Sequence, residues 1–345
     1  LRQTSQTQAT VLEGMTESVV AVDQSESILF ANEAAGRVLG FGPRDVQGRK
    51  LLEVVRSHEL RNSVRSALES RTLNSCDLSW RSDTERTFQV LATPLPGEPC
   101  PGVVVVLRDV TELKRLEGMR QQFVANVSHE LKTPLSSIKA YTETLLSGAV
   151  RDPQHGERFL QRIDEQANRL HQLIMDLLSL ARIESGQAAL EISPVSVIAV
   201  VQQCLTDFEP QASGSGIDLK NGVGDLPLLV SADEESLRLI LGNLIDNAIK
   251  YTPAGGSVAV SARQATDVTV IEVADTGIGI AAADHQRLFE RFYRVDKARS
   301  RELGGTGLGL SIVKHLSQAM GGSVAVRSEL GRGSVFSVIL PNVES

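Results

Sequence analysis

The sequence predicts a multidomain α+β protein, because three different patterns follow one another along its 345 residues. Short β-rich runs mixed with a helical run occupy residues 1–110. A heptad-like spacing of apolar residues replaces them over residues 111–188. Helical and strand patterns then alternate over residues 189–345, which is typical of a two-layer α/β sandwich. We therefore expect three domains with these limits.

The first domain is predicted from short runs of β-branched and apolar residues. Strand-like runs at its start are followed by an amphipathic helical run and by two further strand-like runs around a turn rich in proline and glycine. The strand patterns cover residues 19–22, 28–30, 87–91 and 103–107, and the helical pattern covers residues 34–39. Such a mixture favours a small α+β domain.

The second domain is predicted to be a pair of antiparallel helices. The first helix carries apolar residues from Leu113 to Leu145, and Pro134 inside it predicts a bend. The second helix has a heptad stripe from Phe159 to Leu180. Two helices alone cannot bury these stripes, so we expect two identical chains to form a four-helix bundle. The alternative is that the stripes pack on other domains of the same chain.

The third domain is predicted to contain three helices and at least four strands. The helical patterns cover residues 195–208, 234–251 and 308–320, and the strand patterns cover residues 258–261, 268–273, 323–327 and 335–340. One of these helices carries Asn243, Asn247 and Lys250, which lie three or four residues apart and hence on one face. Two carboxamides and an ammonium could hold Mg²⁺ and phosphate. A merely solvated polar face is the alternative.

Two glycine-containing segments follow this helix. Asp275, Gly277 and Gly279 form a DxGxG sequence directly after a predicted strand. The carboxylate could accept a hydrogen bond from an exocyclic amine such as that of adenine, although Asp-Thr-Gly is also ordinary turn sequence. The glycine-rich run 304–309 opens the last helix, where bare backbone N–H groups suit phosphates. The charged segment between them, residues 289–303, is a candidate lid.

The order of these segments resembles the ATP-binding domain of sensor histidine kinases, which is related to that of DNA gyrase. The resemblance covers roughly residues 194–340 and implies a GHKL or Bergerat-type sandwich that binds ATP and Mg²⁺. It also implies a set of nucleotide contacts, with Asn247 as the Mg²⁺ ligand: Asn243, Asn247, Lys250, Tyr251, Asp275, Gly277, Gly279, Arg291, Tyr293, Gly305, Thr306, Gly307, Leu308 and Gly309.

A segment upstream, Phe123 to Leu135, resembles the phosphoacceptor box of the same kinases. His129 is a competent nucleophile as a neutral imidazole, and the adjacent Glu130 could hold the proton of its other ring nitrogen. The resemblance implies that Thr133 helps orient a water that removes phosphate from a partner's aspartate. A satisfied surface histidine is the alternative, and the matching Glu, Thr and Pro positions argue against it.

Residues 12–114 resemble a PAS sensor domain, whose ligand, if any, the sequence does not reveal. The whole chain is thus expected to be a homodimeric histidine kinase that phosphorylates His129 from ATP, passes the phosphoryl group to an aspartate of a response regulator, and dephosphorylates that regulator. A sensor scaffold without phosphotransfer and a clamping ATPase are the alternatives. A scaffold without phosphotransfer would need a broken motif, and none is visible. A clamping ATPase would leave the His129 segment unexplained.

Composition limits the cellular setting. The net charge of −7 is spread along the chain, which argues against nucleic-acid binding. The three cysteines are far apart and predict neither a disulfide framework nor a zinc site. No stretch approaches the ~20 apolar residues of a membrane span, and the sequence begins at Leu1 without a signal peptide. We expect a cytoplasmic portion of a longer protein that a missing N-terminal segment anchors in the membrane.

Overall fold

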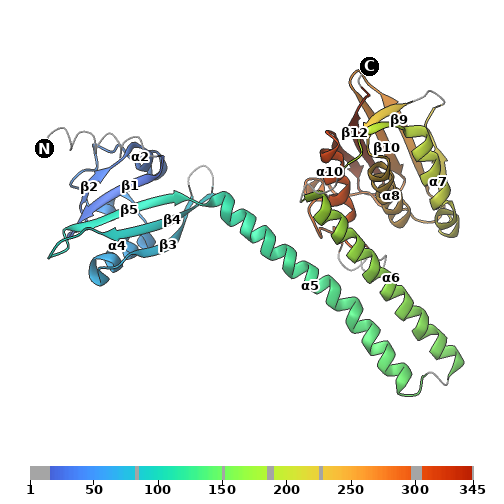
Figure 1. Ribbon diagram of the computed structural model, residues 1–345, viewed down its shortest axis with the longest axis horizontal. Helices are drawn as coiled ribbons and strands as arrows, with labels where there is room; N and C mark the ends of the chain where they lie inside the picture. The colour runs from blue at the N-terminus through green and yellow to red at the C-terminus, as the bar shows by residue number, and fades with distance from the viewer. Residues whose placement is uncertain are drawn as a thin grey trace. The chain divides into compact units, whose positions relative to one another are not determined.

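The computed structural model divides the chain into two compact units, Leu1–Gln122 and Phe123–Ser345, each with its own hydrophobic core. Most of the elements are labelled in Figure 1. The described residues are 16–81, 85–149, 152–184, 190–224, 228–296 and 305–343. Residues 297–303 of the predicted lid lie outside the described residues.

The first unit contains a five-stranded antiparallel sheet in the order β2-β1-β5-β4-β3. Helices pack on it through a core that includes Val22, Leu60 and Phe88. Its strands are β1 (Ser18–Asp23), β2 (Ile28–Ala31), β3 (Asn74–Arg81), β4 (Glu85–Pro94) and β5 (Gly102–Asp109), and its helices are α2 (Glu33–Leu39), α3 (Leu51–Val54) and α4 (His58–Ser70).

Strand β3 was not among the predicted strands. Its Cys76, Leu78 and Trp80 alternate with polar residues and all contact the core of the first unit. The period of two was therefore present in the sequence. It is hard to recognise because the strand also carries asparagine, aspartate and arginine, which are rarer in strands.

The turn that follows β5 caps the start of the next helix, which begins at Thr111. The carboxylate of Asp109 accepts hydrogen bonds from the backbone N–H of Thr111 at 2.9 Å and from its hydroxyl at 2.6 Å. The backbone N–H of Thr87 donates to the same hydroxyl at 2.9 Å, so β4 also contacts this turn. These bonds from Thr111 lower the pKa of Asp109, and one of them satisfies the backbone N–H of Thr111, which has no acceptor within the helix.

Helices α5 (Thr111–Leu146) and α6 (Pro153–Glu184) form the predicted hairpin. Helix α5 stays continuous through Pro134. The apolar residues of this hairpin have two different environments. Leu173 and Leu180 of α6 are 3% and 1% exposed and belong to the core of the C-terminal domain, whereas Leu135 is 59% exposed. This part of α6 therefore packs on another domain of the same chain, which was the alternative to a four-helix bundle of two chains.

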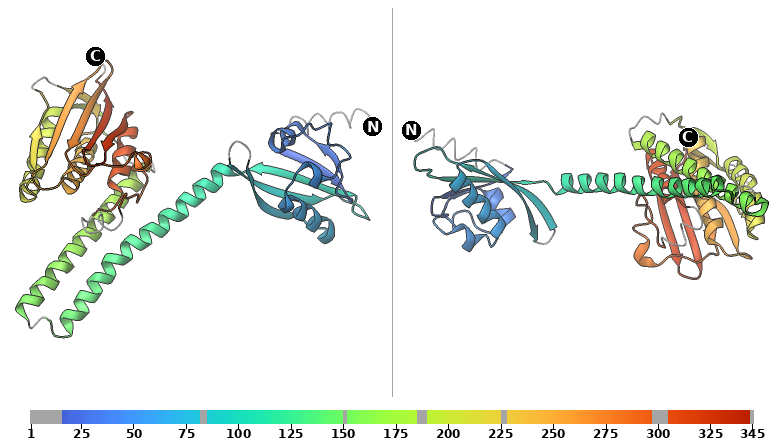
Figure 2. Two further views of the ribbon diagram at one scale, coloured as in Figure 1. Left: turned by 180° about the vertical axis from the view of Figure 1, so that it is seen from behind. Right: turned by 90° about the horizontal axis from the view of Figure 1, so that it is seen from below.

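The rest of the second unit is a two-layer sandwich (Figure 2). Its main sheet has the order β11-β12-β10-β9-β7, in which β7 pairs with β9 in parallel and the other pairs are antiparallel. A second sheet pairs β6 with β8. The strands are β6 (Ser193–Ser196), β7 (Asp218–Asn221), β8 (Leu229–Ala232), β9 (Ser257–Gln264), β10 (Val268–Asp275), β11 (Ser323–Glu329) and β12 (Gly333–Pro341).

Three helices, α7 (Val197–Gly214), α8 (Glu234–Tyr251) and α10 (Gly309–Ala319), pack against this sheet through one continuous core. The predicted start of α7 at Val195 was wrong. Val195 and Ser196 belong to β6, and the hydroxyl of Ser196 caps the helix by accepting the N–H of Ala199 at 3.4 Å. The multidomain α+β class is confirmed, and none of the described helices is apolar enough over its length to cross a bilayer.

We expect Leu244→Ala to destabilise the second unit by about 2–5 kcal/mol, because Leu244 is 1% exposed and its loss leaves a cavity. Urea unfolding followed by circular dichroism measures the change. Leu239→Ala is the matched control on the same helix, since Leu239 is 38% exposed and its truncation should cost about 0.5 kcal/mol or less. Equal losses for both variants would contradict this description of the core.

Candidate functional site

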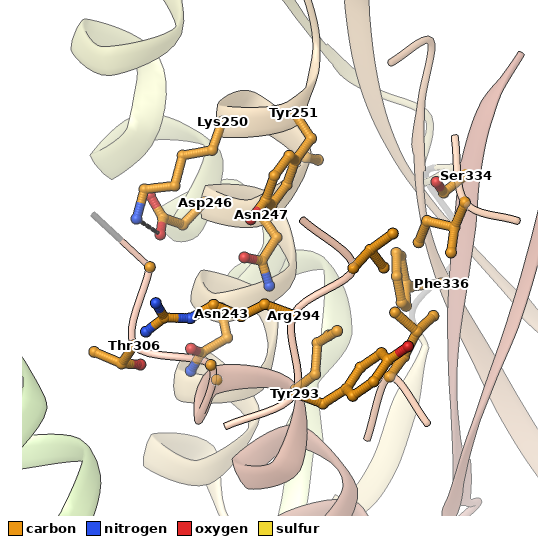
Figure 3. Close-up of a pocket in the computed structure, with 18 of the residues that line it drawn as sticks. Asn243, Asp246, Asn247, Lys250, Tyr251, Tyr293, Arg294, Thr306, Ser334 and Phe336 are labelled. Atoms are coloured by element: carbon orange, nitrogen blue, oxygen red, sulfur yellow. Dashed lines mark hydrogen bonds and ion pairs between the residues drawn. The ribbon is translucent and has the colours of Figure 1, made fainter. Parts of the chain in front are cut away.

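Helix α8 supplies one wall of a cavity in the second unit. Asp233 caps the helix by accepting the N–H of Ser236 at 2.7 Å. Leu237, Ile240 and Leu241 are fully buried on the core side. Because the helix period is 3.6 residues, this burial turns the opposite face toward the cavity. That face carries Asn243, Asp246, Asn247, Lys250 and Tyr251, which all line the cavity (Figure 3).

The charges on this wall are paired with each other. The Lys250 ammonium donates to the Asp246 carboxylate at 2.6 Å, one helical turn away. The Gln211 side chain donates to the other oxygen of Asp246 at 3.0 Å. Asp246 was not predicted as a site residue, although its spacing of three from Asn243 and four from Lys250 places it on the same face.

The end of β10 supplies the second wall. Asp275 accepts the backbone N–H of Gly277 at 2.8 Å and that of Ser334 at 3.2 Å through one oxygen. Burial raises the pKa of this carboxyl group, and the two amide bonds act in the opposite direction. Asp275 and Gly279 line the cavity, whereas Gly277 does not. Gly277 instead lies against the C-terminal end of α8, where a β-carbon would come 2.5 Å from the carbonyl oxygen of Tyr251.

The glycine-rich loop supplies the third wall. Gly305, Thr306, Gly307 and Gly309 line the cavity at the start of α10. A β-carbon at Gly309 would lie 2.5 Å from Oδ1 of Asn243, so the absence of a side chain lets the loop approach α8. Leu308, predicted as a nucleotide contact, is fully buried in the core and holds the loop to the domain.

Apolar side chains complete the cavity, which has a volume of about 220 Å³. Ile280, Leu288 and Phe336 line it, with Phe336 contributed by β12 (Figure 3). Sequence reasoning missed Phe336 and Ser334, since a strand residue gives no local sign that its side chain faces a cavity rather than a core. Tyr293 also lines the cavity, and its hydroxyl donates to Asp284 at 2.6 Å.

Arg291 lies elsewhere. It pairs with Glu184 of α6, and its guanidinium stands 5.5 Å from the ring centre of Phe123. Arg291 is not among the cavity-lining residues, so the structure does not bring this predicted contact to the others. Arg294, three residues on, does line the cavity and was not predicted.

The phosphoacceptor segment lies on α5. His129 and Thr133 are exposed, and the Thr133 hydroxyl donates to the carbonyl oxygen of His129 at 3.1 Å. Glu130 is half-buried and accepts from Arg294 at 3.0 Å, with Arg169 at 3.8 Å. No described residue bonds to the His129 ring. In this arrangement Glu130 therefore contacts the two arginines and not the imidazole of His129.

Asn247 is the metal ligand that the sequence predicts. Among the residues that the structure describes, no cluster of three or more histidine, cysteine, aspartate or glutamate side chains could hold an ion by itself. Asn247 projects its carboxamide into the cavity (Figure 3). An amide oxygen, phosphate oxygens and water are suitable ligands for Mg²⁺, because this ion usually keeps several bound waters and takes few ligands from the protein.

Three protein families match successive parts of the chain. Residues 12–115 match the PAS fold, residues 119–186 match the His Kinase A phospho-acceptor domain, and residues 232–344 match the histidine kinase-, DNA gyrase B- and HSP90-like ATPases. With the three parts in this order, the chain belongs to the sensor histidine kinases of two-component systems.

The relatives agree with this class. The chain is 31% identical over 340 residues to the sensor histidine kinase WalK of Bacillus subtilis and 31% identical over 334 residues to the sensor protein SrrB of Staphylococcus aureus. Each alignment covers 97% of this chain and 55% of the relative, so the chain spans about half of their length.

Solved structures show the same fold. Histidine kinase ThkA, in a complex with the response regulator TrrA, aligns with a TM-score of 0.54 over 97% of this chain and 98% of its own, at 21% identity. Histidine kinase AdeS of Acinetobacter baumannii aligns with a TM-score of 0.52 over 63% of this chain and 98% of its own, at 24% identity.

We expect Gly279→Ala to destabilise the second unit by several kcal/mol. The residue has a φ of 65°, and a β-carbon there would lie 2.0 Å from the carbonyl oxygen of Glu329. Gly331→Ala is the control, because Gly331 has a φ of 80° but no atom within 4 Å of the same position. It should cost only about 1 kcal/mol. Thermal unfolding compares the two, and similar losses would show that the close approach to Glu329 is unimportant.

Proposed function

We propose that the chain is an ATP-dependent protein-histidine kinase in which the cavity of the C-terminal domain binds ATP and His129 accepts its terminal phosphoryl group. One observation carries the proposal. The asparagine face of α8, Asp275 and the glycine loop, which are far apart in the sequence, line a single cavity in a chain that also contains the His129 segment. The domain limits 1–110, 111–188 and 189–345 belong to the same proposal.

The adenine base fits the Asp275 side of the cavity. One carboxylate oxygen of Asp275 is held by two backbone amides, which leaves the other to accept a hydrogen bond from an exocyclic amine. Ile280 and Phe336 offer apolar surface for the faces of a planar base. The glycine at 279 allows the backbone to approach closely because nothing projects from it.

The phosphates fit the opposite side, between α8 and the glycine loop. Backbone N–H groups at the start of α10 and the Lys250 ammonium supply positive charge there. Asn247 would hold Mg²⁺, which neutralises phosphate charge when bound. Since Lys250 is paired with Asp246, it has to exchange that carboxylate for a phosphate oxygen, or to share both, when nucleotide binds.

In the transfer step a ring nitrogen of His129 attacks the terminal phosphorus of ATP. A P–N bond forms, the bond to the bridging oxygen breaks, and ADP leaves. Glu130 would hold the proton of the other ring nitrogen and so fix the tautomer. Both arginines contact Oε2 of Glu130, so this role would use Oε1 or would require Glu130 to exchange the arginines for the imidazole.

We expect His129→Gln to abolish labelling of the protein by γ-³²P-ATP with Mg²⁺, because the nucleophile is removed. The label on the unmodified chain should be acid-labile and alkali-stable, as a phosphoramidate is. His171→Gln, which removes an exposed histidine from α6, is the control and should keep full labelling. Undiminished labelling of the His129 variant would overturn the proposal.

The partners are part of the same proposal. Ile174, Met175 and Leu178 of α6 and Leu135 of α5 are between 42% and 59% exposed in the single chain, which a four-helix bundle with a second copy would cover. A response-regulator receiver domain would supply the aspartate that takes the phosphoryl group from His129. The ThkA complex with TrrA supports a partner of this class.

The chain would also dephosphorylate that regulator, with Thr133 orienting the attacking water. We expect Thr133→Ala to slow dephosphorylation by ~10-fold while autophosphorylation stays within about 2-fold, because only the water loses its positioning contact. The substrate is a receiver domain that accepts label from His129. Thr142→Ala is the control, since its hydroxyl makes the same bond to a carbonyl four residues back at 2.8 Å. If both variants dephosphorylate at the unmodified rate, Thr133 has no such role.

A further inference from the structure

Helix α6 places a carboxylate against the glycine loop. Asp176 is 6% exposed and lines the cavity, although it belongs to the hairpin and not to the ATP-binding domain. One of its oxygens accepts from the Thr306 hydroxyl at 2.7 Å, and the other accepts from Gln172 at 2.8 Å. The Thr306 oxygen in turn accepts the backbone N–H of Leu308 at 3.2 Å. Asp176 thus reaches the backbone that would cradle phosphates.

Apolar packing fixes this carboxylate in place. Leu173, three residues before Asp176, and Leu180, four residues after it, are 3% and 1% exposed within the core of the C-terminal domain. All three side chains lie on one face of α6, because residues three and four apart are neighbours on a helix. The packing of these leucines fixes the rotation of α6 that turns Asp176 toward the cavity.

The charge of Asp176 has no direct countercharge. No described lysine, arginine or histidine forms an ion pair with it: Lys250 pairs with Asp246 and Arg294 pairs with Glu130, and the charge of Lys250 acts on Asp176 only at longer range. Burial, together with the negative charge of Asp246, raises the pKa of Asp176, and the bonds from Thr306 and Gln172 and the charge of Lys250 partly offset this. Any further negative charge brought to this side of the cavity would be opposed, because Coulomb repulsion is strong where water is excluded.

We propose that Asp176 is a positioning residue that makes this arrangement of α6 and the glycine loop disfavour nucleoside triphosphates relative to diphosphates. The inference rests on the proposed binding of nucleotide phosphates beside the glycine loop. A triphosphate carries one more phosphoryl group than a diphosphate, and the Asp176–Thr306 contact stands beside the loop that would bind it. The hairpin thereby senses whether the terminal phosphoryl group is present, and triphosphate binding favours release of Thr306 from Asp176.

The test measures the dissociation constants of Mg-ADP and of Mg-β,γ-imido-ATP with the whole chain by calorimetry. Asp176→Asn keeps an acceptor for Thr306 and removes the charge. It should tighten binding of the triphosphate analogue by ~10-fold relative to ADP. Asp176→Ser, a smaller neutral residue, should shift the ratio in the same direction. Asp164→Asn is the control, because it makes the same change at an exposed position of the same helix and should leave the ratio unaltered.

The outcomes separate this inference from the function on which it rests. If the unmodified chain binds neither nucleotide, the proposed function itself fails. If the unmodified chain binds both and labels His129, but neither neutral variant changes the ratio of the two constants, only the role of Asp176 is overturned. Equal changes for both nucleotides would also overturn it, since a purely structural role would affect them alike.

Discussion

The site depends on the burial of one face of α8. Leu237, Ile240, Leu241, Leu244 and Ile245 are at most 1% exposed, and their packing against the sheet fixes the rotation of the helix about its axis. Successive residues are about 100° apart around a helix, so the same rotation decides which side chains face the cavity. The core and the polar wall are therefore two consequences of one constraint, and a change in core packing would displace the asparagines with it.

Close backbone approaches set the shape of the opposite walls. At Gly279 the chain passes so near the carbonyl of Glu329 that a methyl group would not fit, and at Gly309 the loop passes close to the side-chain amide oxygen of Asn243. These approaches join segments that are 50 and 66 residues apart in the sequence. The cavity is consequently bounded mostly by backbone and short side chains on the glycine-loop side, which leaves N–H groups available to a ligand.

Charges link the hairpin to the ATP-binding domain within the second unit. Glu130 pairs with Arg294, Glu184 pairs with Arg291, and Asp176 accepts from Thr306. Each contact joins an acidic residue of α5 or α6 to the segment between residue 291 and the start of α10. Side-chain contacts thus connect the segment that carries His129 with the rim of the cavity, because Arg294 both pairs with Glu130 and lines the cavity.

The sequence by itself determined the class of fold, the order of the domains and most of the residues of the site. These features depend on local periodicity, as in α8, or on glycine and asparagine patterns such as those around residues 275–279 and 305–309. The tertiary structure alone decided that Phe336 and Asp176 line the cavity, that Arg291 does not, and that Glu130 is held by arginines. Contacts of this kind join segments distant in sequence, and no local pattern encodes which of two neighbouring charged side chains will meet a given partner once the core has packed.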